Sequence, residues 1–187
     1  MPEKLDAGRP LASWLDAVAS DRPLPAGGRV ASVAAAFAAA LVEKVAHIVR
    51  RSPSRAALHS LAELVQARVA PLRPALVALG AADDKAYAAL IASRTTGNEA
   101  AHHEARLSAA RTQVELVAQA GEVARLAADL EAKVGPALRA DLATARLLAV
   151  AAAHGAHGNV TANLGALGDE AADRLREQAN EAVAALP

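Results

Sequence analysis

The chain has 187 residues, with 20 basic and 20 acidic side chains, 53% hydrophobic residues, no cysteine and one each of Trp, Tyr and Phe. Balanced charge without single-sign runs argues against broad nucleic-acid binding, and three aromatic residues provide neither a stacking platform nor a membrane belt. The lack of cysteine excludes disulfides, thiolate nucleophiles and cysteine-ligated metals. Residues 1–9 carry charges in place of the apolar run of a signal peptide. We therefore expect one domain over residues 1–187, cytoplasmic, with no nucleic-acid or membrane partner.

Alanine makes up 54 of the 187 residues, and no segment alternates apolar and polar residues between turn signals. The chain is therefore predicted to be all-α, a multihelical bundle of seven or eight helices around Ala-rich central helices. Pro71 and Pro74 are expected to kink or split one segment, and Gly121 to break another. The expected segments are 10–20, 29–51, 55–79, 83–93, 99–134, 138–164 and 169–185.

The segment after Gly28 is the most informative for architecture, because Ser32 is the only polar residue between Val30 and Val42. A helix without a polar face is predicted to be buried on every side, and residues 147–153 form a similar run. At about 25 cal/mol per Å², an alanine-lined core gains less per residue than a leucine-lined one. We therefore expect a homodimer that shares one or both apolar helices; the alternative is a monomer with a thin core.

Two adjacent glycines, Gly27 and Gly28, lead directly into this apolar helix. Glycine permits close backbone approach, and the first N–H groups of a helix have no partner within it, so a carboxylate or carbonyl can dock there. The turn lacks the Gly-Lys-Ser/Thr of a phosphate-binding loop. The alternative is a tight entry turn with only a packing role.

Asp83 and Tyr87 are four residues apart, which places them on one face of a helix. A carboxylate in a dry pocket beside a phenol can act as a general acid or base. Helix capping by Asp83 is the alternative, and Asp84 is interpreted as the solvated member of the acidic pair.

Asn159 and Asn163 form a second pair one helical turn apart, after two glycines that each cost up to about 1 kcal/mol within a helix. Paired amides on one face can recognise a planar amide or a pyrimidine-like ring by hydrogen bonding. A hydrogen-bonded pair between packed helices is an equally good interpretation.

The histidines do not predict a metal site. His154 and His157 have a spacing that can hold a metal, but no third ligand follows at a fixed distance. Solvated or rim histidines are the better interpretation, and we expect no metal.

Taken together and in this order, these pieces resemble the cyclodeaminase/cyclohydrolase family, which includes methenyltetrahydrofolate cyclohydrolases and the C-terminal domain of formimidoyltransferase-cyclodeaminase. The similarity covers nearly the whole chain and is carried by four matches. These are SWLDAVASDRPLPAGGRVASVAAAFAAALVEKVA, which resembles the family's glycine turn and Ala-rich helix; DDKAYAAL; Arg106; and RADLATARLLAVAAAHGAHGNVTANLGAL, which resembles its Ser-Asp, apolar helix and paired asparagines.

The resemblance implies a homodimeric helical enzyme whose substrate is a tetrahydrofolate derivative. It would hydrolyse methenyltetrahydrofolate or close formiminotetrahydrofolate with loss of ammonia, as a hydrolase or lyase of one-carbon metabolism. The resemblance assigns Asp83 and Asp141 as catalytic. The implied substrate-binding residues are Gly27, Gly28, Arg29, Tyr87, Arg106, Asn159 and Asn163.

This sequence departs from the family pattern at several pocket positions. Ala26 replaces the third glycine, Arg29 replaces a small hydroxyl, Ala140 replaces the serine before Asp141, and Arg94 is the nearest cation to an expected lysine. These departures leave two alternatives open. One is an enzyme for another imine or amidine-type small molecule, and the other is a non-catalytic helical dimer that binds a ligand.

Overall fold

The structure, a computed structural model, describes residues 10–187, so the expectation about residues 1–9 lies outside it. The described chain is all-helical, as predicted, and has six α-helices and one 3₁₀ helix. The helices are α1 (Leu11–Val18), α2 (Gly27–Arg51), η1 (Pro53–Leu58), α3 (His59–Ser93), α4 (Glu99–Glu131), α5 (Pro136–Leu164) and α6 (Glu170–Ala184).

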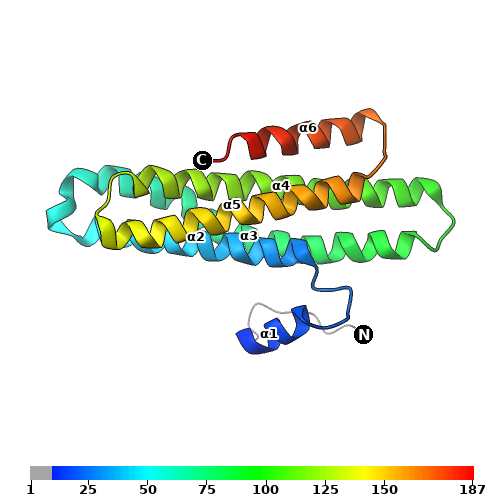
Figure 1. The fold of residues 1–187 in the computed structure, drawn as a ribbon, viewed down its shortest axis with the longest axis horizontal. Helices are drawn as coiled ribbons and strands as arrows, with labels where there is room; N and C mark the ends of the chain where they lie inside the picture. The colour runs from blue at the N-terminus through cyan, green and yellow to red at the C-terminus, as the bar shows by residue number, and fades with distance from the viewer. Residues whose placement is uncertain (1–9) are drawn as a thin grey trace.

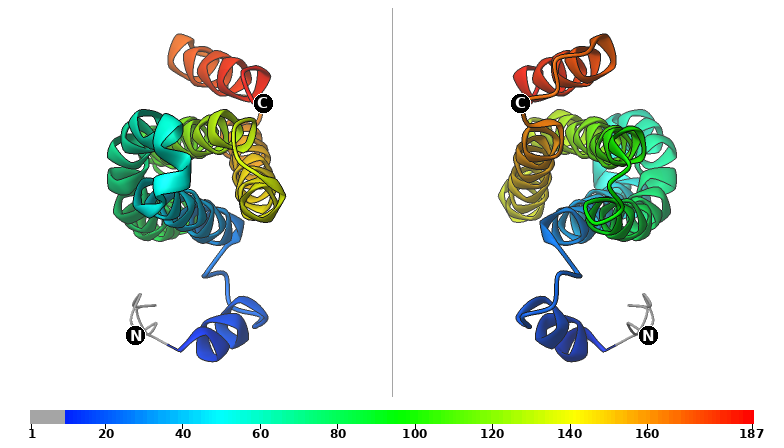
Figure 2. Two further views of the ribbon diagram at one scale, coloured as in Figure 1. Left: turned by 90° about the vertical axis from the view of Figure 1, so that its left-hand side faces the viewer. Right: turned by 90° about the vertical axis from the view of Figure 1, so that its right-hand side faces the viewer.

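Four long helices, α2 to α5, lie side by side and form the body of the molecule (Figure 1). Viewed from the end, these four helices form a ring, with α6 packed on α4 and α5 and with α1 on the opposite side (Figure 2). Alanine, valine and leucine fill this core. The short helix α1 stands apart from the bundle, and none of its residues is buried. The Ala-rich composition therefore gives a closely packed four-helix body with one detached helix.

The predicted count of seven or eight helices was wrong, because segments 55–79 and 83–93 largely join in one helix, α3. Pro71 and Pro74 lie inside α3 and are both exposed. Each proline removes the N–H that would bond the carbonyl four residues earlier, here those of Ala67 and Ala70. These carbonyls belong to exposed or half-buried positions, where water can hydrate them, so the helix continues.

The break expected near Gly121 is also absent, and α4 runs without interruption to Glu131. Gly121 is buried, and a β-carbon at this position would lie 3.4 Å from Leu186 Cδ2. That is an ordinary van der Waals distance, and a single glycine within a helix costs only about 1 kcal/mol, so α4 continues through this position. By contrast, Gly165 has a φ of +47° and ends α5 near the predicted boundary.

The apolar helix α2 was predicted to be buried on every side. In the single chain this prediction is wrong, because only one side of α2 is buried. Ala35, Ala38 and Ala39 are fully buried, but Phe37 is 54% exposed. On the second apolar run, Leu147 is 61% exposed. By length and composition α2 is apolar enough to cross a membrane, but half of that stretch is buried within the bundle, and a buried core helix passes the same test.

Candidate active site

A polar cavity of about 450 Å³ opens between the first turn of α2 and the helices α3, α4 and α5. It brings together most of the residues that the sequence singled out. The predicted residues that line it are Gly27, Gly28, Asp83, Tyr87, Arg106, Asn159 and Asn163. The glycine turn, the aspartate and the paired asparagines thus share one hollow, although they come from three separate helices.

Asp83 lies in the interior of α3 and is only 5% exposed. It is therefore not a helix cap. The side-chain amide of Gln113 on α4 donates a hydrogen bond to Asp83 Oδ1. Burial raises the pKa of the Asp83 carboxyl, and the negative charge of Asp84 acts in the same direction, whereas Gln113 and Arg29 oppose the shift. Asp83 thus keeps its proton to a higher pH than an exposed aspartate does.

Gly28 explains how a helix end approaches this carboxyl so closely. A β-carbon at Gly28 would collide with Gln113 Nε2 and with Asp83 Oδ2. The position therefore accepts only glycine unless the Asp83–Gln113 pair moves. A packing role and a site role coincide here, because the atoms that exclude a side chain are the polar atoms of the cavity.

Gln113 also connects Asp83 to the asparagine pair. Its amide nitrogen donates to Asp83, and its Oε1 accepts from Asn159 Nδ2 at 3.4 Å. Gln113 is 1% exposed, so both ends of its amide depend on these partners. The chain Asp83, Gln113, Asn159 fixes the orientation of both amides within the cavity.

Sequence reasoning missed Gln113, although the sequence contains a signal for it. Gln113 is the polar member of an otherwise apolar stripe that includes Ala109, Ala110, Leu116 and Val117, all of which are buried. A single amide at a core position of an amphipathic helix requires a buried partner. That signal could have identified the residue, but not its partner.

Two of the predicted site residues lie outside the cavity. Arg29 is 3% exposed and points toward α3, where Nη1 donates to the Val77 carbonyl at 3.3 Å and Nε lies 3.7 Å from Asp84 Oδ2. Asp84 is the more exposed of the two acids, as expected, with 23% of its side chain exposed, although partial burial still raises its pKa. Asp141 accepts a hydrogen bond from Lys44 Nζ at 2.7 Å and does not line the cavity.

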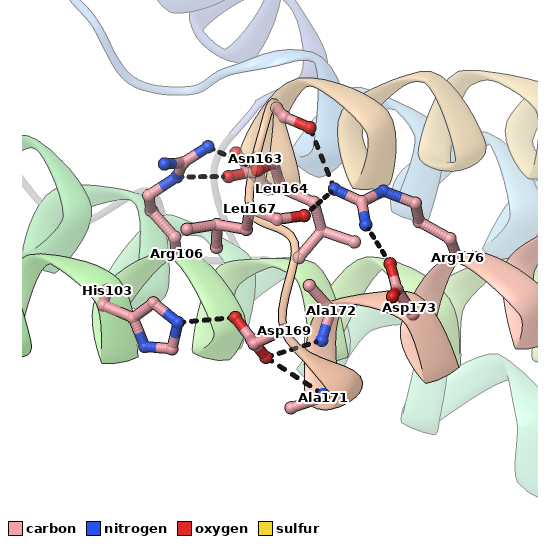
Figure 3. A network of polar contacts seen from close by, with 11 residues as sticks. His103, Arg106, Asn163, Leu164, Leu167, Asp169, Ala171, Ala172, Asp173 and Arg176 are labelled. Atoms are coloured by element: carbon pink, nitrogen blue, oxygen red, sulfur yellow. Dashed lines mark hydrogen bonds and ion pairs between the residues drawn. The ribbon is translucent and has the colours of Figure 1, made fainter.

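Arg106 lines the cavity and also holds the end of α5 in place (Figure 3). Its Nε donates to the Asn163 carbonyl at 2.8 Å and its Nη2 to the Leu164 carbonyl. Carbonyls in the last turn of a helix have no partner within it, so the guanidinium satisfies them. Arg106 therefore fixes the backbone of Asn163, one of the two asparagines of the site.

The turn from α5 to α6 is held by two further groups in Figure 3. Asp169 Oδ1 accepts from the backbone N–H groups of Ala171 and Ala172 at the start of α6, and Oδ2 lies 2.7 Å from His103 Nε2. The hydrogen bond to His103, followed by that from Ala172, lowers the pKa of Asp169. Arg176 donates to the carbonyls of Gly165 and Leu167. These contacts hold the turn that directly follows the end of α5, next to Asn163 of the cavity.

The geometry defines a helical protein with a site for a small molecule, in which one buried carboxyl can move a proton and fixed amides can orient a polar ring. The matching family model is described as formiminotransferase-cyclodeaminase and covers residues 10–181. The chain therefore belongs to the formiminotransferase-cyclodeaminase family.

A solved structure gives the same result for the fold. The crystal structure of formiminotetrahydrofolate cyclodeaminase from Thermotoga maritima is similar, with a TM-score of 0.89 and 25% identity. The match covers 95% of this chain and 90% of that one. No curated protein sequence gives a significant match.

Proposed function

We propose that this protein is a folate-dependent one-carbon enzyme that hydrolyses methenyltetrahydrofolate or closes formiminotetrahydrofolate with release of ammonia. The observation that carries the proposal is the buried Asp83 carboxyl in a polar cavity shared with Gln113, Asn159 and the Gly27–Gly28 turn. The family and the similar cyclodeaminase structure support the substrate class. The cytoplasm, where we expected the protein from its sequence, remains its proposed location.

Both reactions pass through a tetrahedral carbon between two nitrogens and need several proton transfers. In hydrolysis, water adds to the amidinium carbon and loses a proton; one C–N bond then breaks as its nitrogen gains a proton, and the hydroxyl on the carbon loses its proton to become the formyl oxygen, so that one proton is released overall. In cyclisation, the amine attacks the formimino carbon and loses its proton, and the formimino nitrogen gains a proton and leaves as ammonia. Asp83 is proposed to take and return these protons, because its carboxyl lines the cavity and burial, which raises its pKa, makes the carboxylate a stronger base than an exposed aspartate.

The remaining lining residues are proposed to bind the substrate. Asn159 and Asn163 would hydrogen-bond the ring, Tyr87 would lie along it, and the backbone of Gly27 and Gly28 would approach it closely. Arg106 contributes by holding Asn163. Asp141 and Arg29 are not part of this proposal, because neither lines the cavity.

The test is to incubate the purified protein with methenyltetrahydrofolate and follow the loss of its near-ultraviolet absorbance, and in parallel to measure ammonia released from formiminotetrahydrofolate. Asp83→Asn keeps an acceptor for Gln113 and removes the titratable group. We expect it to lower kcat by about 10²–10⁴-fold while folate still binds.

Other outcomes select among the alternatives. Turnover that survives Asp83→Asn would remove Asp83 from the mechanism. If the wild-type protein binds folate without turnover, the non-catalytic binding dimer is supported. If the wild type shows no binding and no turnover, a different imine or amidine-type substrate is favoured.

We also propose that the protein is a homodimer joined through α1 and the outer face of α2. A second cavity, of about 690 Å³ and mainly apolar, lies between these helices and α3, and includes Leu11, Trp14, Leu15 and Phe37. Leu11 and Leu15 are 60% and 56% exposed on a helix that has no buried residue. A second copy offers the same apolar face and can cover it symmetrically. Light scattering should give a mass of two 19.0 kDa chains.

A further inference from the structure

The cavity is long, and its residues on α3 follow one stripe of the helix. Asp83, Tyr87, Leu90 and Arg94 are spaced four, three and four residues apart and all line it. With a rise of 1.5 Å per residue, Asp83 and Arg94 are separated by about 16 Å along the helix axis. The cavity therefore extends along α3 for about three turns.

On the facing helix α4, the residues that line the cavity span a similar length, from His102 to Gln113, and run in the opposite direction to those on α3. Gln113 donates to Asp83 at one end, and His102 Nδ1 lies 2.9 Å from Ser93 Oγ at the other. These two contacts close the ends of a slot whose walls are α3 and α4. Tyr87 and Leu90 lie between the ends and offer an aromatic ring and an apolar side chain to the middle of a ligand.

The two ends of the slot differ in charge. Among the described residues that line the cavity, Asp83 is the one acidic side chain. Arg94 and Arg106 line the half that lies toward the α3–α4 loop. Arg106 already uses Nε and Nη2 on the carbonyls of Asn163 and Leu164. Arg94 is exposed at the mouth, and within residues 10–187 no hydrogen bond or ion pair engages its guanidinium.

We infer that Arg94 binds the terminal carboxylate of an elongated substrate whose reacting carbon lies beside Asp83, and that Arg94 is thus a specificity-determining residue. This inference rests on the proposed function, since it assigns the glutamate part of a folate to the Arg94 end. A guanidinium matches a carboxylate with two parallel hydrogen bonds, and the positive charge of Arg106 adds to the attraction. The separation of about 16 Å requires an elongated ligand, and Tyr87 and Leu90 between the ends favour an apolar or aromatic middle.

The distance also defines what Arg94 does not do. It is too far from Asp83 to touch the reacting atoms, so it acts on binding and leaves the chemical step unchanged. Ligands that lack the terminal carboxylate should therefore not distinguish the wild type from a variant at this position.

The experiment measures, by titration calorimetry, the binding of 5-formyltetrahydrofolate and of its pteroate form, which lacks the glutamate. Arg94→Gln should weaken binding of the complete folate on the order of tenfold and leave the pteroate form unchanged. Arg94→Lys keeps the charge but not the paired hydrogen bonds, so it should retain part of the affinity. Arg111→Gln is the matched control, since Arg111 lies exposed on α4, pairs with Glu104 and does not line the cavity.

An equal loss for both ligands, or no loss for either, would overturn the inference. If the wild type binds neither folate, the proposed function fails, and the inference is then decided by p-aminobenzoylglutamate against p-aminobenzamide. Preference for the glutamate form that disappears in Arg94→Gln would support a carboxylate site for another elongated ligand. Absence of that preference would reject the site.

Discussion

Two cavities in the described part of the chain lie on opposite sides of α2 and differ in the side chains that line them. The cavity of about 450 Å³ is lined by a carboxyl, amides and arginines, whereas that of about 690 Å³ is lined mainly by apolar side chains of α1 and α2. Gly28 faces the first and Val30 and Phe37 face the second. One apolar helix therefore borders two different environments, because its first turn completes the polar cavity and its following turns line the apolar cavity.

Arg29 shows how sharply the two sides are divided. Consecutive residues of a helix differ by about 100° in direction, so the side chain after Gly28 turns away from the polar cavity. Arg29 instead joins α2 to α3 through Val77 and Asp84. A substitution that looks like a change of the active site in sequence is a change in helix packing in the structure.

The largest effect is expected from a methyl group placed in the polar cavity. Gly28→Ala brings a β-carbon onto Gln113 and Asp83, so the pair must move. We expect kcat/KM to fall by about 10²-fold, since misplacement of a catalytic group by about 1 Å has that effect. Overpacking should cost about 1–3 kcal/mol in the free energy of unfolding. Steady-state kinetics and urea unfolding measure both.

Gly158→Ala is the matched control on α5. A β-carbon there meets no atom within 4 Å, and the position is exposed within a helix. Alanine should raise stability by up to about 1 kcal/mol and leave the kinetics unchanged. If both variants behave alike, the close approach at Gly28 has no special role.

The second prediction concerns the apolar cavity. Phe37→Glu places a charge on the proposed dimer face, where burial without a partner is unfavourable. The dissociation constant of the dimer should rise by at least about tenfold, measured by analytical ultracentrifugation. Leu64→Glu changes an equally exposed side chain that does not line this cavity, and should leave the dimer intact. A monomeric wild type would contradict the dimer directly.

The third prediction uses the buried charge of Asp83. Burial raises its pKa, so the folded chain binds this proton more tightly than the unfolded chain, and ionisation of Asp83 lowers stability at neutral pH. Asp83→Asn should therefore raise Tm at neutral pH; in a chain of this size, each 1 kcal/mol of penalty removed corresponds to roughly 2–4 °C. The difference should disappear below the ordinary aspartate value of 3.8, where both states are protonated. Thermal unfolding from pH 3 to 8 measures it, and a lower Tm at pH 7 would count against a penalty from burial.

The smallest expected effect concerns Asp169, at the turn between α5 and α6, and has the opposite sign. Hydrogen bonds from His103 and Ala172 lower the pKa of Asp169, so its ionised form stabilises the fold above the ordinary value of 3.8 and this contribution is lost as the pH falls through the lowered pKa. Asp169→Asn keeps a cap for α6 and should lower Tm slightly at neutral pH. The difference should vanish in acid, below the pKa of folded Asp169. A constant difference across this range would show that charge is not the cause.

Much of the site was accessible from sequence because its parts are local patterns. The double glycine before an apolar helix, the Asp83–Tyr87 spacing and the Asn159–Asn163 spacing each depend on residues within one or two helical turns. The pairing of Gln113 with Asp83 was not accessible from sequence, because the two residues are 30 positions apart and only helix packing brings them together. The catalytic expectation for Asp141 has no support in the geometry, since Asp141 pairs with Lys44.

The sequence by itself determined the helical class and most helix ends, because alanine content, glycine stops and the spacing of apolar residues act locally on the backbone. Only the tertiary structure decided that α3 continues past two prolines, that Arg29 faces α3, and that α1 stands apart. Those outcomes depend on which groups meet across helices and which remain in water. The burial that raises the pKa of Asp83 likewise exists only once the helices have packed.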